Sequence, residues 1–80
     1  MTDIEKFVNQ FQQQYIDADD FKMDDSTEFR KIGSWDSLTG MAILIMIQDN
    51  YQVTIPDGVF RSFKLVREVF DYVMINKPKS

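Results

Sequence analysis

The sequence predicts a single all-α domain, a four-helix bundle built from three main helices and one short helix. The chain has 80 residues, which is enough for one hydrophobic core but not for two. Hydrophobic residues make up 44% of the chain, so it can fill such a core and wholesale disorder is excluded. Apolar residues also recur at helical spacing in three segments. We therefore treat residues 1–80 as one domain.

The first helix is predicted over residues 3–16. Thr2 and Glu5 have the spacing of a capping box, which marks a helix start. The apolar residues that follow at helical spacing are Ile4, Phe7, Val8, Phe11 and Tyr15. Periodicity then fails over residues 17–35, and this stretch is predicted to be a long loop. Its apolar residues, expected to hold the loop to the core, are Phe21, Met23, Phe29 and Ile32.

The second helix is predicted over residues 36–51, with Asp36 or Ser37 as its cap. Two apolar stripes run along it. The stripe expected to face the core consists of Ile43, Leu44, Ile47 and Tyr51. The second, which we call the outer stripe, consists of Leu38, Met41 and Ile45. Because the chain is short, few other residues are left to cover both stripes. We therefore expect the outer stripe to dock a partner. The alternative is that the long loop and the last helix cover it.

Two further helices are predicted near the C-terminus. Pro56 favours a first helical position, which predicts a short helix over residues 56–61. Ser62 can cap a final helix over residues 63–75. Its apolar stripe consists of Val66, Val69, Phe70 and Val73. Residues 76–80 form a polar tail, in which Pro78 prevents further helix.

Composition excludes most small-enzyme chemistry. The chain has no Cys and no His, so thiolate nucleophiles, imidazole bases and metal sites made from these residues are ruled out. We therefore expect no catalysis by this chain. The net charge is −4 without a clustered basic face, which argues against nucleic-acid binding.

The longest apolar run, residues 41–47, is far shorter than the roughly 18 residues of a membrane span. The first residues also lack the cationic start of a signal peptide. We expect a cytoplasmic monomer.

Acidic residues between Asp17 and Glu28 have part of the spacing of a calcium-binding loop. However, Lys22 occupies the sixth place, where that loop requires Gly for its sharp turn. We interpret the stretch as a solvated acidic loop and expect no metal site.

Ser37 is the strongest candidate site. A serine at a helix start after a long loop is exposed, and a phosphate esterified there would be stabilised by the helix dipole by about 0.3–1 kcal/mol. Because the chain has no His or Cys, Ser37 cannot be an activated nucleophile of its own enzyme. If Ser37 reacts, another enzyme must modify it.

Several motifs in order make the chain resemble the acyl carrier protein family. They are Asp36-Ser37-Leu38 at the start of an apolar helix, then Tyr51, then Ile55-Pro56-Asp57, then Phe70-Asp71-Tyr72-Val73. The resemblance implies an acyl-carrier-protein-like four-helix bundle that carries 4'-phosphopantetheine, taken covalently from coenzyme A, on Ser37. The thiol of that group would hold acyl or related intermediates as thioesters in fatty-acid, polyketide or specialised biosynthesis.

The same resemblance implies partners: a phosphopantetheinyl transferase, which Asp36 would help to dock, and acyl-loading and acyl-processing enzymes. Fatty-acid carriers similar to this chain have several acids along the helix after the serine, whereas here Asp49 is the only one. We therefore expect partners to be met through Leu38, Met41 and Ile45. Two alternatives stay open: a peptidyl or aminoacyl carrier of a nonribosomal pathway, and a small all-α protein-interaction adaptor in which Ser37 is only a helix cap.

Overall fold

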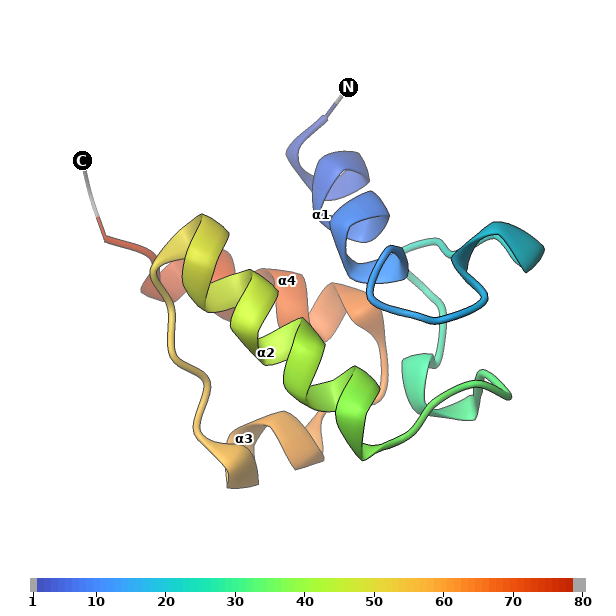
Figure 1. The fold of residues 1–80 in the computed structure, drawn as a ribbon. Helices are drawn as coiled ribbons and strands as arrows, with labels where there is room; N and C mark the ends of the chain where they lie inside the picture. The colour runs from blue at the N-terminus through green and yellow to red at the C-terminus, as the bar shows by residue number, and fades with distance from the viewer. Residues whose placement is uncertain (1, 79–80) are drawn as a thin grey trace.

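The computed structural model describes residues 2–78 and confirms the predicted all-α fold. Four α-helices follow one another in the chain: α1 (Asp3–Gln12), α2 (Ser37–Tyr51), α3 (Asp57–Ser62) and α4 (Val66–Asn76). Two single-turn 3₁₀ helices, η1 (Ala18–Asp20) and η2 (Phe29–Lys31), lie in the long connection between α1 and α2. In Figure 1, α2 crosses in front of α4, while α1 lies above them and α3 below.

The core lies where α1, α2 and α4 meet, and α1 contacts both of the longer helices. Its fully buried side chains are Phe7, Phe11, Phe29, Ile43, Ile47, Val66, Val69 and Val73. These come from each of the three main helices and from η2, so the long connection supplies part of the core. Within residues 2–78, no helix combines the length and the apolar character needed to cross a membrane.

Helix α1 begins as predicted and ends earlier than predicted. The Thr2 hydroxyl accepts a hydrogen bond from the Glu5 amide at 3.2 Å, and the Glu5 carboxylate accepts one from the Thr2 amide at 3.0 Å, which completes the capping box. The helix ends at Gln12 rather than at residue 16. The Gln12 side-chain amide donates to the carbonyls of Ala18 and Phe21, so this residue organises the turn that follows.

Helix α4 begins at Val66, three residues later than predicted, and the expected cap at Ser62 is wrong. The Ser62 hydroxyl instead donates to the Val59 carbonyl at 2.6 Å, inside α3. The long connection pairs with Leu65, through an antiparallel bridge from Glu28, and with the first turn of α4. The Val66 amide donates to the Thr27 carbonyl at 3.2 Å, and the Arg67 amide to the Asp25 carbonyl at 2.9 Å.

Each bound of α2 and α3 that differs from the prediction differs by one residue. Helix α2 begins at Ser37 instead of residue 36, because Asp36 is its N-cap with extended backbone. Helix α3 covers Asp57–Ser62 instead of residues 56–61, with Pro56 as the residue before its first turn.

Candidate functional site

Ser37 is the first residue of α2 and its side chain is exposed. The cap of this helix is Asp36, whose carboxylate accepts hydrogen bonds from the Thr39 amide at 2.8 Å and from the Thr39 hydroxyl at 3.0 Å. The interpretation in which Ser37 caps the helix is therefore wrong. In the described part of the chain, the Ser37 hydroxyl has no hydrogen-bond partner. Helix α2 thus starts without help from this hydroxyl, which is left exposed.

The Asp36 carboxyl group beside Ser37 is held in its charged form. The hydrogen bond from the Thr39 amide lowers its pKa most, and the bond from the Thr39 hydroxyl lowers it further. The exposed site therefore presents a hydroxyl and, one residue before it, a carboxylate that stays ionised at neutral pH.

Trp35 fixes the path by which the chain enters α2. Its ring lies against Gly40, where an added Cβ would come within 3.1 Å of the ring atom Cη2. The same ring packs near Phe29 and Phe60, with centroid distances of 5.6 and 6.4 Å. Gly40 is thus needed for close approach of an aromatic ring, and that ring links the start of α2 to Phe60 of α3.

Arg30 joins the long connection to α3. Its guanidinium lies over the rings of Phe29, Trp35 and Phe60, at 4.7, 5.6 and 5.1 Å from their centroids. It also donates hydrogen bonds to the carbonyls of Phe60, at 2.6 Å, and of Phe63. No sequence pattern indicates this role, because Arg30 lies in an aperiodic stretch and its partners are about 30 residues further along the chain.

These contacts shape a shallow hollow of about 330 Å³ beside Ser37, between α2 and α3. This volume is at the lower end of the range for ligand pockets. The side chains and backbone that line it come from Arg30, Trp35, Ser37, Gly40, Met41, Leu44, Asp57, Phe60 and Arg61. A group attached to Ser37 would therefore have an open, partly aromatic surface next to it, with cationic side chains at the border.

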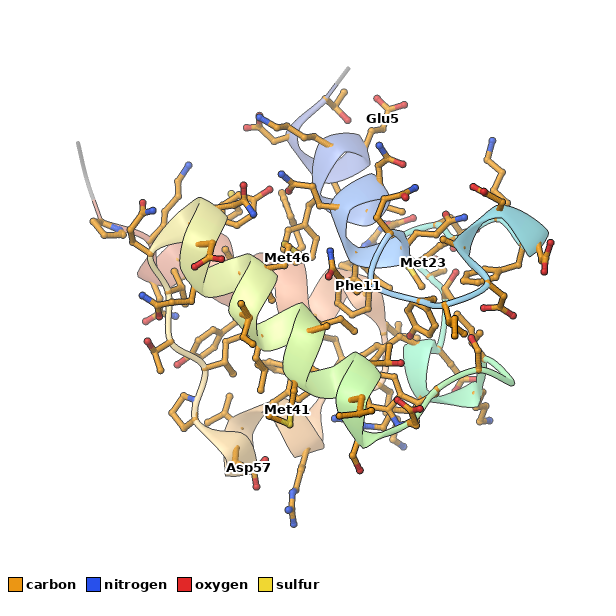
Figure 2. All side chains as sticks on the ribbon, in the orientation of Figure 1. Glu5, Phe11, Met23, Met41, Met46 and Asp57 are labelled. Atoms are coloured by element: carbon orange, nitrogen blue, oxygen red, sulfur yellow. The ribbon has the colours of Figure 1, made fainter. Side chains whose placement is uncertain are left out.

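The outer stripe is exposed, as predicted. Leu38, Met41 and Ile45 keep 75, 58 and 57% of their surface accessible. On the opposite side of the helix, Ile43 and Ile47 are completely buried. Figure 2 shows the division with two methionines: Met41 lies on the side of α2 towards α3, and Met46 on the side towards α1. The alternative in which the loop and α4 cover the outer stripe is wrong.

Several acidic side chains of the long connection accept hydrogen bonds or form ion pairs within the protein. The Asp24 carboxylate accepts from the Ser26 amide at 2.8 Å, Asp17 accepts from the Ser34 hydroxyl at 2.5 Å, and Asp25 pairs with Arg67. No group of three or more acids placed to hold a metal ion is present among residues 2–78. These contacts shape the turns of the loop and attach it to α4.

No protein-family model, curated protein or solved structure matches this chain.

Proposed function

We propose that this chain is an acyl carrier protein, which carries 4'-phosphopantetheine on Ser37 and has no catalytic activity of its own. The observation that carries the proposal is the state of the Ser37 hydroxyl. It is exposed at the first position of α2, and it does not cap the helix because Asp36 does so. The free hydroxyl and the hollow beside it fit a group attached at Ser37.

The residues around Ser37 have separate roles in this proposal. On modification the Ser37 hydroxyl gives up its proton, its oxygen forms the bond to phosphorus, and coenzyme A loses adenosine 3',5'-bisphosphate. We assign the base to the transferase, since this chain has no His and the lowered pKa of Asp36 makes its carboxylate a weak base. Asp36 holds the start of α2 in place and offers a charge for the transferase to recognise. When attached, the group supplies a terminal thiol that carries the acyl cargo as a thioester.

The outer stripe supports the same proposal. A carrier must be recognised in turn by the transferase and by the enzymes that load and process its cargo. Leu38, Met41 and Ile45 form an apolar surface that starts next to Ser37 and runs along α2. Exposed apolar surface of this kind is typical of interaction sites, and the flexible side chain of Met41 suits contact with several partners.

Intact-mass spectrometry tests the proposal. The apo protein is incubated with coenzyme A and a broad-specificity phosphopantetheinyl transferase, and a gain of one phosphopantetheine is expected. Ser37→Ala should abolish the gain while circular dichroism stays unchanged, because Asp36 caps the helix. Ser62→Ala is the matched control, since Ser62 is also exposed and its loss should leave the gain intact. A protein that gains no mass would refute the proposal and favour the adaptor alternative. A Ser37→Ala variant that still gains mass would refute Ser37 as the attachment site.

A further inference from the structure

Two arginines from different elements border the hollow beside Ser37, and they differ in what their side chains already bind. Arg30, from η2, donates through both terminal nitrogens to backbone carbonyls at the end of α3. Arg61, from α3, is bound only through Nε, which lies 2.9 Å from the Asp57 carboxylate. In the described part of the chain, the two terminal nitrogens of Arg61 make no hydrogen bond. Of the two arginines that border this hollow, Arg61 therefore has N–H donors available for another acceptor.

The pair between Arg61 and Asp57 is easily exchanged. Both side chains are largely exposed, at 77 and 71% of their surface. Exposed pairs four residues apart on a helix contribute little to stability. The guanidinium can therefore turn to a stronger acceptor at little cost, and a phosphate is such an acceptor because its oxygens match the planar fork of an arginine.

A phosphodiester on Ser37 also needs a nearby cation. It would carry a negative charge one residue away from the ionised carboxylate of Asp36. Like charges at this separation repel each other, and a guanidinium across the hollow offsets that repulsion.

We propose that Arg61 binds the phosphodiester attached to Ser37 and orients the carried arm across the hollow between α2 and α3. The inference rests on the proposed function, since it requires Ser37 to be modified. Arg61 acts here as a positioning residue, and Asp57 holds its guanidinium near the hollow until the phosphate is in place.

The test uses the modified protein and reads the phosphate directly. Once intact mass shows one phosphopantetheine, the ³¹P resonance of the wild type is compared with that of Arg61→Gln, Arg61→Lys and Arg67→Gln. Arg67 is the matched control, because it is also an exposed arginine paired with an aspartate, but it lines a different hollow, beside α1 and the long connection. We expect Arg61→Gln to shift the resonance by more than its linewidth, Arg61→Lys to restore part of the shift, and Arg67→Gln to leave it unchanged.

Two further measurements sharpen the result. The ¹H–¹⁵N signal of the Arg61 Nε group should move when apo protein becomes modified, while that of Arg30 stays in place. The difference between wild type and Arg61→Gln should shrink between roughly 0.05 and about 0.5 M salt, because added ions screen an exposed pair. A ³¹P resonance that is the same in wild type and Arg61→Gln, or that Arg67→Gln shifts equally, would overturn the role of Arg61. A chain that gains no phosphopantetheine at all would instead overturn the proposed function.

Discussion

The contact between Gly40 and Trp35 allows a quantitative test of how the Trp35 ring packs against α2. A Cβ added at Gly40 would lie 3.1 and 3.3 Å from two atoms of the Trp35 ring. Ordinary van der Waals contact begins at about 3.5 Å between carbon atoms, so the ring would have to move by a few tenths of an ångström. It has little freedom to do so, because Phe29 and Phe60 pack near it and the guanidinium of Arg30 covers it.

Two opposing terms set the effect of Gly40→Ala on the free energy of unfolding. Replacing Gly by Ala inside a helix stabilises it by about 1 kcal/mol. Inserting a methyl group into a well-packed site costs about 1–3 kcal/mol. We expect the packing cost to win and stability to fall by about 1 kcal/mol, which lowers the Tm of a domain of this size by roughly 4–8 °C.

A double-mutant cycle isolates the packing term. Trp35→Phe removes the ring atoms nearest to Gly40, so Gly40→Ala in that background should stabilise the protein by about 1 kcal/mol through helix propensity alone. Urea unfolding of all four proteins, followed by circular dichroism, gives the coupling energy, which we expect to be about 2 kcal/mol. Trp35 is the only tryptophan, so its fluorescence reports the local environment in the two proteins that keep it. If Gly40→Ala stabilises both backgrounds equally, Trp35 does not pack against α2 as described.

Three further predictions concern α2. Thermal melts should show that Ile47→Ala lowers the free energy of unfolding by about 2–5 kcal/mol, because it truncates a core side chain. Ile45→Ala should change this free energy by no more than about 0.5 kcal/mol, and equal losses would contradict the division between the buried and exposed faces of α2. The pKa of Asp36 is lowered on folding, so its contribution to stability is present above its unfolded-state pKa and is lost as pH falls through the folded-state pKa. Asp36→Asn, which caps without titrating, should therefore lose less stability in acid, and identical pH profiles of unfolding would speak against this. Binding to a cognate acyl-loading or acyl-processing enzyme should depend only weakly on salt and be strongly impaired by Met41→Asp, as titrations at several salt concentrations can show. A steep salt dependence that disappears when the acids of residues 17–28 are neutralised would assign recognition to the loop instead.

The sequence by itself determined the all-α class, the four helices and most of their bounds, because these depend on local patterns. The capping box at Thr2 and Glu5, the repeat of apolar residues in α2 and the position of Pro56 each act within a few residues. The same local pattern separated the buried Ile43 and Ile47 from the exposed outer stripe, since helical spacing alone decides which side chains share a face. It also placed Ser37 at the start of a helix.

Only the tertiary structure decided what depends on contacts between distant segments. Helix α4 starts where residues 25–28 pair with Leu65 and the first turn, and where the Glu68 carboxylate accepts a hydrogen bond from the Leu65 amide at 2.8 Å. The second contact is local, but nothing in residues 62–66 indicates a pairing partner so far back in the chain. The hollow beside Ser37 exists because Trp35 fits against Gly40 and because Arg30 reaches the end of α3. An arginine in an aperiodic loop has no preferred partner in sequence terms, since its hydrogen bonds depend on which carbonyls the fold brings within reach. For that reason the serine could be found from the sequence, whereas the arginines and the aromatic ring that surround it could not.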